Sequence, residues 1–225
     1  MNAPDLKWAC AQAALPLISE KMTIGLGGGT TISHLVDLLS QADRTDVRVV
    51  TPSQTTRDYC LQKDFTVLNL QDVSKVDVAF DGCDQVDQHF NALKSGGAIH
   101  TREKLVASMA DDYILLVDES KFVDSLTFDV PVTLEVLPDA YSYVQCEIQQ
   151  LGGHAVPRKS PAKDGFTISD YGNIILDASF AKFPNIASLD QKLREIHGIV
   201  DTSLFVGCVT KIIVTSPSGS KILEK

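Results

Sequence analysis

The stretch MTIGLGGGTTISHLVDLLSQ, residues 22–41, contains a short apolar run, a glycine cluster and an amphipathic segment in immediate succession. The apolar run, Met22 to Leu26, is typical of a buried strand. From Thr30 onward, apolar side chains recur at helical spacing. They are Ile32, Leu35, Val36 and Leu39. A strand that passes through a tight turn into a helix is the building unit of α/β proteins, so this stretch predicts an α/β fold.

The same alternation continues on both sides of that stretch. Helices are predicted from Asp5, over 53–62 and over 101–110. Strands are predicted at VRVVTP (47–52), FTVLNL (65–70), KVDVAFDG (75–82) and YILLVDESK (113–121). Because these strands are continuous apolar runs, they indicate a parallel sheet covered on both faces. In such a sheet, ligands bind beyond the carboxyl ends of the strands.

The regular alternation of predicted strands and helices changes after Pro131. Strands are predicted at 131–138, 154–159, 173–180 and 199–207, with helices over 140–153 and 189–198. This β-α-β-β-α-β order is that of ferredoxin-like domains. The last segment, TKIIVTSPSGSKILEK (210–225), is expected to return to the first sheet as a hairpin. The predicted fold is a Rossmann-like parallel-sheet domain, residues 1–130 plus 207–225, with a smaller α+β ferredoxin-like domain, residues 131–206.

Composition narrows the class of function. The 225 residues carry a formal net charge of −9, which argues against a nucleic-acid-binding surface. An anionic substrate would therefore need a locally positive site. The five cysteines are scattered and odd in number, which indicates reduced thiols in a cytoplasmic protein rather than a disulfide framework. We find no signal peptide, and no run approaches the ~20 apolar residues of a membrane span.

The glycine cluster GLGGGTT (25–31) offers backbone N–H groups, two hydroxyls and a helix N-terminus to an anion. It is not a dinucleotide fingerprint, because Thr30 stands where the third glycine is needed, and it lacks the lysine of a P-loop. The alternative is a tight turn with Thr30 as the helix N-cap.

A second candidate, FDGCDQVD (80–87), places Asp81 and Asp84 at the end of a buried strand. Gly82 would allow the backbone to approach a ligand closely. The alternatives are an acidic turn and a metal site, for which only His89 is near in sequence. We interpret Cys83 as a packing residue rather than a nucleophile.

A third candidate, LKSGGAIHTREKLVA (93–107), leads through a glycine turn into a helix. If Thr101 caps this helix, Glu103 lies in its first turn, where the helix dipole favours the ionised carboxylate that a general base requires. Leu105, Val106 and Met109 define the predicted apolar face, with Glu103 on its flank. Gly96 and Gly97 would let Lys94 point at the same cleft. The alternative is an ordinary acidic first turn.

Two further lysines are ambiguous. Lys121, in the polar turn that ends YILLVDESK, could bind phosphate or be solvated, and Lys7 on the first helix is more ambiguous still. The five histidines show no paired spacing, and we interpret them as structural or exposed.

Together these stretches resemble the ribose-5-phosphate isomerase A family over nearly the whole chain. IGLGGGTT, VDVAFDGCDQVD, ALKSGGAIHTREKLVA, LLVDESK, VPVTLEVLP and GNIILD occur in the family's order and spacing. The resemblance implies interconversion of D-ribose 5-phosphate and D-ribulose 5-phosphate in the pentose phosphate pathway. It further implies a cytoplasmic enzyme without metal or coenzyme, in a homodimer or larger homo-oligomer. We expect no nucleic-acid or membrane partner.

The resemblance also implies roles for individual residues. Glu103 is the proton acceptor through a cis-enediolate, Lys94 stabilises the enediolate oxygen, and Asp81 assists ring opening or shuttles the hydroxyl proton. The predicted substrate-binding residues are Gly28, Gly29, Thr30, Thr31, Asp81, Gly82, Cys83, Asp84, Lys94, Ser95, Gly96, Gly97, Lys121 and Lys7.

The chain departs from the family's usual motifs at three places. Its phosphate loop has Gly28 and Thr30 where GTGST is common, which loses one hydroxyl and keeps one. Gln85 replaces the last acid of DGADE, and Ser95 replaces a glycine of KGGG. None of these changes removes a predicted catalytic group.

Two other classes of function compete with this one. CoA transferases share a layered α/β fold and use a glutamate as nucleophile, so an acyl-CoA would modify Glu103. A non-catalytic sugar-phosphate sensor would bind its ligand without turnover.

Overall fold

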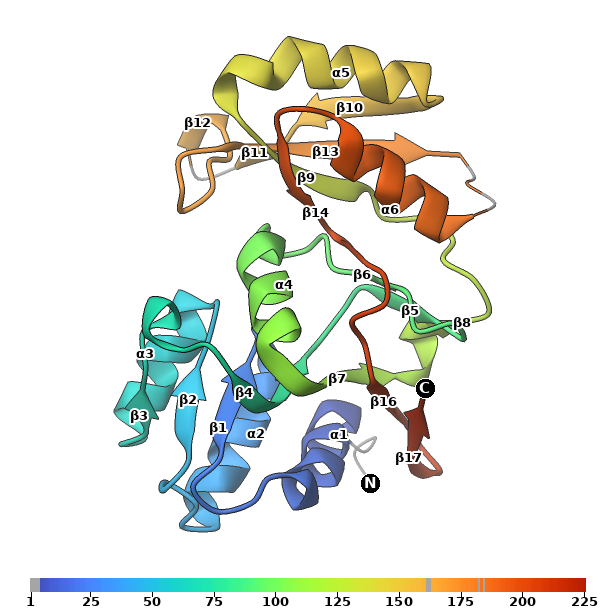
Figure 1. Cartoon of the computed structure of the whole chain (residues 1–225). Coiled ribbons are helices and arrows are strands. Elements are labelled where there is room, and N and C mark those ends of the chain that lie inside the picture. Colours follow the sequence, from blue (N-terminus) through green and yellow to red (C-terminus); the bar gives the residue numbers. More distant parts are fainter. Residues whose placement is uncertain (1–4, 161–162, 182, 184) are drawn as a thin grey trace.

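The computed structural model describes residues 5–160, 163–181, 183 and 185–225 (Figure 1). Its largest sheet has seven strands in the order β17-β16-β7-β4-β1-β2-β3. All neighbours pair in parallel except β16 and β17, which form the predicted antiparallel C-terminal hairpin. The strands are β1 (Thr23–Leu26), β2 (Arg48–Val50), β3 (Thr66–Val67), β4 (Val76–Asp81), β7 (Ala110–Asp118), β16 (Lys211–Ser216) and β17 (Gly219–Glu224).

Helices cover both faces of this sheet, as the apolar strands predict. On one face lie α1 (Leu6–Ala14), α2 (Thr30–Gln41) and α3 (Gln54–Gln62), and on the other lies α4 (His100–Met109). Strand β4 shows why both faces are apolar. Phe80 joins the core under α1 and α2, while Ala79 joins the core under α4. Successive strand residues point to opposite faces, so a strand that is covered on both sides needs apolar residues on both faces.

A second, antiparallel sheet has the order β10-β13-β9-β14. Its strands are β9 (Val132–Val136), β10 (Gly153–Pro157), β13 (Ile174–Phe180) and β14 (Ile199–Thr202). Helices α5 (Tyr141–Gln150) and α6 (Ile186–Glu195) pack against it around one apolar core. Chain order and sheet order together are those of the ferredoxin-like fold, which confirms the predicted fold class.

A third sheet, β15-β6-β5-β8, lies between the other two (Figure 1). Its strands are β5 (Gln85–Asp87), β6 (Ala92–Leu93), β8 (Phe122–Val123) and β15 (Leu204–Phe205). A separate pair is formed by β11 (Lys159–Ser160) and β12 (Lys163–Phe166). Short 3₁₀ turns are η1 (Leu15–Leu17), η2 (Leu70–Asp72), η3 (Glu119–Lys121) and η4 (Pro138–Ala140).

Two predicted strands differ from the structure. The strand predicted over 199–207 is two strands, because the chain leaves the ferredoxin-like sheet at Ser203 and pairs next with β6. The strand predicted over 65–70 is only two residues long. The domain boundaries at 130/131 and 206/207 stay a prediction. Within the described residues, no helix has the length and apolar character to cross a membrane.

Candidate active site

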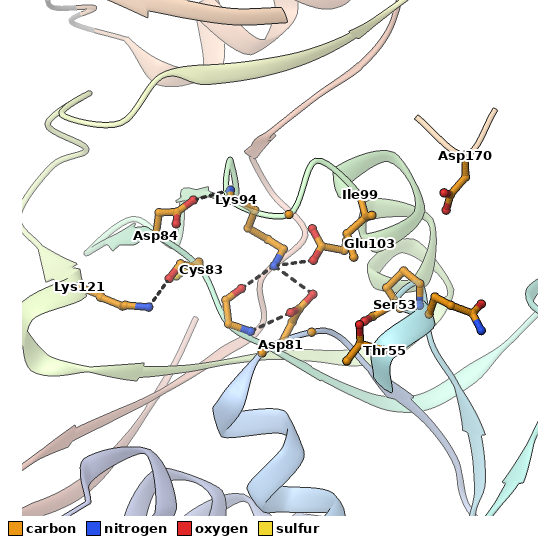
Figure 2. Close-up of a pocket in the computed structure, with 17 residues that line it drawn as sticks. Ser53, Thr55, Asp81, Cys83, Asp84, Lys94, Ile99, Glu103, Lys121 and Asp170 are labelled. Carbon is orange, nitrogen blue, oxygen red and sulfur yellow. Dashed lines mark hydrogen bonds and ion pairs between the residues drawn. The ribbon is translucent and has the colours of Figure 1, made fainter. Parts of the chain in front are cut away.

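A cavity of about 690 Å³ opens at the carboxyl ends of the parallel strands (Figure 2). This volume lies within the ~300–1,000 Å³ typical of small-molecule sites. The cavity is lined by Gly28, Gly29, Pro52, Ser53, Gln54, Thr55, Asp81, Gly82, Cys83, Asp84, Lys94, Gly96, Gly97, Ile99, Glu103, Lys121 and Asp170.

At the base of the cavity, the Lys94 ammonium lies between two carboxylates (Figure 2). Its Nζ is 3.0 Å from Asp81 Oδ2 and 3.3 Å from Glu103 Oε1, and it also donates to the Gly82 carbonyl. The side chains of Lys94 and Asp81 are 5% and 4% exposed, and that of Glu103 is 9% exposed. Three charges with this little solvent contact are expensive to bury unless each is paired, which this geometry achieves.

Asp81 is fixed by its position at the end of β4. Its Oδ2 accepts a hydrogen bond of 3.1 Å from the buried Tyr113 hydroxyl, and its Oδ1 accepts one of 2.8 Å from the Gly82 N–H. Gly27 faces it across the turn after β1. A Cβ at Gly27 would lie 1.9 Å from Asp81 Oδ1, so only glycine leaves room for the carboxylate. The buried carboxylate also helps to raise the pKa of the Tyr113 hydroxyl, after the larger effect of burial.

Glu103 occupies the middle of the buried face of α4, not its flank. That face consists of His100, Glu103, Val106 and Ala107. Leu105, predicted to be apolar core, is 47% exposed. Val106 and Met109 do pack in the core, so the predicted apolar face is wrong only at Leu105. Because the buried face also contains His100 and Glu103, the apolar residues alone locate its centre wrongly.

The start of α4 also differs from the prediction. The helix begins at His100 with Ile99 at the N-cap position and no side-chain cap. The Thr101 hydroxyl instead donates to Glu135 on β9. Glu103 nevertheless lies in the first turn, as expected.

The pKa of Glu103 moves in the direction opposite to the one that the helix dipole favours. Burial raises it to about 7, the Lys94 ammonium opposes the rise, and Asp81 adds to it. Burial alone would lower the pKa of Lys94, but the carboxylates of Asp81 and Glu103 outweigh burial and raise it. Near neutral pH, the site thus holds a fixed cation beside a carboxyl group that can both accept and release a proton.

The loop from Lys94 to Gly97 is held in place by Asp84. Its Oδ2 accepts hydrogen bonds from the N–H groups of Ser95, at 2.6 Å, and Gly96, at 3.1 Å. The Ser95 side chain points away from the cavity, where its hydroxyl lies 3.1 Å from that of Ser203. Ser95 is therefore buried between the sheets and does not line the cavity.

Lys121 and Cys83 meet at one side of the cavity. Lys121, at the end of η3, donates to the Cys83 carbonyl at 2.9 Å and lines the cavity. Burial raises the pKa of the Cys83 thiol to about 12, so it stays protonated. A protonated, buried thiol is a poor nucleophile, consistent with a packing role.

The glycine cluster contributes only part of its predicted residues to the cavity wall. Gly28 and Gly29 line the cavity, whereas Thr30 and Thr31 begin α2 and do not. Thr30 is not the N-cap; Gly29 is, with φ of 96°, a conformation that favours glycine. Lys7 lies exposed on α1 and does not line the cavity.

Sequence reasoning missed six lining residues. Pro52, Ser53, Gln54 and Thr55 follow β2, and Ser53 caps α3 by accepting from the Thr56 N–H at 3.2 Å. The rule that sites lie at carboxyl strand ends could have found this segment. Ile99 and Asp170 carry no comparable sequence signal. In the described part of the chain, no group of three or more His, Cys, Asp and Glu side chains is arranged to hold a metal ion.

Comparison with known proteins gives a consistent result. The family model described as ribose 5-phosphate isomerase A (phosphoriboisomerase A) matches residues 48–219. Ribose-5-phosphate isomerase A of Thermococcus kodakarensis is 37% identical over the full length of both chains, and that of Synechococcus sp. is 35% identical over 96% of this chain and 95% of its own.

Solved structures agree with the sequence comparison. Ribose 5-phosphate isomerase A of Methanocaldococcus jannaschii superposes with a TM-score of 0.92 at 33% identity, covering 98% of this chain and 99% of its own. A D-ribose-5-phosphate isomerase in complex with phospho-erythronic acid superposes with a TM-score of 0.93 at 33% identity over the full length of both chains. The chain therefore belongs to the ribose-5-phosphate isomerase A family and is an isomerase.

Proposed function

We propose that this protein interconverts D-ribose 5-phosphate and D-ribulose 5-phosphate, with Glu103 as the base. The observation that carries the proposal is the contact of the Lys94 ammonium with both Glu103 and Asp81 inside one cavity at the strand ends. A relative of the same fold was solved with phospho-erythronic acid, which supports a phosphorylated sugar derivative as the ligand class.

Glu103 moves the carbon-bound proton in this mechanism. Aldose–ketose isomerisation transfers one proton between C1 and C2, and a single carboxylate can serve both carbons from one face of a cis-enediolate. A base that must also return the proton works best when its pKa is near the working pH. The pKa of Glu103, raised by burial to about 7, meets that requirement.

Lys94 stabilises the negative charge that develops on the enediolate oxygen. The carboxylates beside it raise its pKa, so it remains a cation throughout the working range. Because it is buried, its interaction with a developing oxyanion is screened less than in water. Its hydrogen bond to Gly82 fixes its direction before substrate arrives.

Asp81 and Asp84 act on the sugar hydroxyls. Asp81 assists ring opening or moves the proton between the two oxygens, since it contacts Lys94 and lies beside Glu103 in the same cavity. Asp84 orients sugar hydroxyls with the carboxylate oxygen that is not bonded to the 94–97 loop.

The phosphate is bound by the N–H groups around Gly28 and Gly29, at the start of α2, and by Lys121. Thr30, Thr31 and Lys7 complete the predicted phosphate contacts, although none lines the cavity of this structure. In this proposal the protein acts in the non-oxidative pentose phosphate pathway of the cytoplasm, as a homodimer or larger homo-oligomer.

The direct test is turnover of ribose 5-phosphate by the chelator-treated protein, wild type against Glu103→Gln. Wild-type activity with a loss of at least about 10²-fold in the variant supports the assignment. An inactive wild type, or a variant that turns over at the wild-type rate, would refute it. Modification of Glu103 by an acyl-CoA would favour the CoA transferase alternative, and binding without turnover would favour the sensor.

A further inference from the structure

A second cavity, of about 470 Å³, lies beside the active cavity, where β2 and β3 end. Its wall includes Thr51, which follows β2, and Leu68, which follows β3. It shares Ser53 and Gln54 with the active cavity. The two cavities therefore adjoin at the first turn of α3, along the sheet edge where ligands of α/β proteins bind.

Two arginines line this second cavity, although the chain as a whole carries a net charge of −9. Arg57 lies on α3, one turn after Ser53, and no carboxylate among the described residues forms an ion pair with it. Arg102 immediately precedes Glu103 on α4. Successive helix residues diverge by about 100°, so Glu103 reaches the active cavity and Arg102 the neighbouring one.

The ion pair that Arg102 forms with Asp170 is weak. Arg102 Nη1 lies 2.6 Å from Oδ2 of Asp170, whose side chain is 61% exposed. Ion pairs this exposed contribute little, so an incoming dianion can compete for the guanidinium. Two further acids stand beside lining residues in the sequence, Asp58 and Asp72. They accept hydrogen bonds from the amides of Gln54 and Asn69 and do not line the cavity.

We propose that Arg57 and Arg102 form a second phosphate subsite, which takes the far phosphate of a sugar bisphosphate whose sugar occupies the active cavity. Guanidinium groups bind phosphate through paired, charge-assisted hydrogen bonds, and two in one polar cavity favour a dianion. The subsite rests on the proposed function, because that function places the sugar. Ribose 5-phosphate has one phosphate and leaves the subsite empty, so a pentose bisphosphate binds more tightly and inhibits.

The test compares two ligands that cannot be isomerised because neither has a carbonyl group, ribitol 5-phosphate and ribitol 1,5-bisphosphate. Calorimetry on the wild-type protein should give the bisphosphate a Kd lower by about tenfold or more. Arg57→Gln should bring the ratio of the two Kd values close to one. Asp170→Asn should widen the ratio, because it removes the carboxylate that competes for Arg102.

Arg48→Gln is the matched control. Arg48 is an exposed arginine at the amino end of β2, on the opposite edge of the same sheet, and its loss should leave the ratio unchanged. Unchanged binding of ribitol 5-phosphate by Arg57→Gln shows that this variant is folded.

Three results would overturn the subsite. They are equal affinities in the wild type, a ratio that survives Arg57→Gln, and a ratio that Arg48→Gln lowers as much as Arg57→Gln does. In these cases ribitol 5-phosphate still binds, so the proposed function stands. If neither ligand binds the wild type, the proposed function and the subsite both fail.

Discussion

Lys94 contacts two carboxylates, a backbone carbonyl and the ring of Phe205, whose centroid is 5.6 Å from Nζ. Such a set of contacts fixes the ammonium in one place. In the proposed mechanism that fixed position is what Lys94 contributes to turnover, since the developing oxyanion then meets a cation that needs no rearrangement.

Replacing Lys94 by alanine should lower kcat by about 10²–10³-fold, the usual cost of losing one oxyanion donor. The measurement is steady-state turnover of ribose 5-phosphate. Lys75→Ala is the control, because the Lys75–Asp111 pair is 66% and 60% exposed and should not affect kcat. If the kcat of Lys94→Ala is within about threefold of the wild-type value, Lys94 does not stabilise the enediolate.

The pH dependence of activity should follow Glu103. In the proposed mechanism its carboxylate is the base, and its pKa is raised to about 7 by burial. We therefore expect kcat/KM to fall as pH drops below 7, approaching tenfold per pH unit at acid pH. A profile that stays flat down to pH 5 would contradict a base with this pKa.

The same residue should destabilise the fold at alkaline pH. The folded pKa of about 7 lies above the ordinary glutamate pKa of 4.5, so the folded protein holds a proton that the unfolded chain has lost. The stability contributed by the protonated form is therefore present below pH 4.5 and is lost as pH rises through 7. Glu103→Gln should raise the free energy of unfolding at pH 8, by on the order of 1–3 kcal/mol, and change it little at pH 4. Urea unfolding at both pH values measures this, and a variant less stable at pH 8 would refute it.

At the scale of the elements, Glu135 connects helix α4 to the ferredoxin-like sheet. It lies on β9, a strand of that sheet, and bonds to Thr101 in the first turn of α4. This buried carboxylate accepts hydrogen bonds from Thr101, from Ser169 at 2.6 Å and from Asn173 at 2.7 Å. Burial opposes its ionisation, but these hydrogen bonds outweigh burial and lower its pKa. The first turn of α4, which carries Glu103, is therefore attached to the other sheet.

Glu135→Ala should lower the free energy of unfolding by on the order of 2–4 kcal/mol, because it leaves buried donors without an acceptor. Since the pKa of Glu135 is lowered, its contribution is present at neutral pH and is lost as pH falls through the folded pKa. Thermal unfolding at neutral and acid pH measures this. The control, Glu195→Ala, removes an exposed acid at the end of α6 and should shift Tm little. Equal shifts in the two variants would contradict the role of Glu135.

At the scale of the whole molecule, the chain crosses between sheets and returns. Ser203 lies at one crossing, where its carbonyl accepts from the Lys94 N–H at 3.0 Å and its N–H donates to Thr133 at 2.8 Å. The chain then re-enters the large sheet as β16, between β7 and β17. The C-terminal hairpin therefore completes the sheet whose strand ends carry the site.

Truncation after Val206 should abolish folding. It removes β16, whose residues Ile212, Ile213 and Val214 are at most 3% exposed, and burial of each contributes about 1.5–3 kcal/mol. That sum is comparable to the ~5–15 kcal/mol stability of a typical domain. Truncation after Ser218 removes only β17, a mostly exposed edge strand, and should lower Tm without unfolding the protein. Circular dichroism distinguishes the two, and a folded shorter chain would refute the prediction.

The layered fold could be predicted from the sequence because its signal is local. Buried parallel strands such as β4 carry apolar residues on both faces, and helices such as α2 have apolar residues at helical spacing. The strands missed, β5, β6, β8, β11 and β12, are two to four residues long, too short to show a period. Their existence depends on partners that are distant in the chain.

The features of the site also fall into two groups, those that the sequence predicts and those that depend on the tertiary structure. The sequence by itself determined which strand ends and turns bear unusual residues, among them Asp81, Lys94 and Glu103. Local patterns locate these residues, and the order of the family's motifs implies their roles. The tertiary structure alone decided that Glu103 is central on a buried face, that its pKa is raised, that Ser95 turns away and that Asp170 reaches the cavity. Burial and Coulomb interactions depend on what lies within a few ångströms in space, and a linear pattern does not contain those distances.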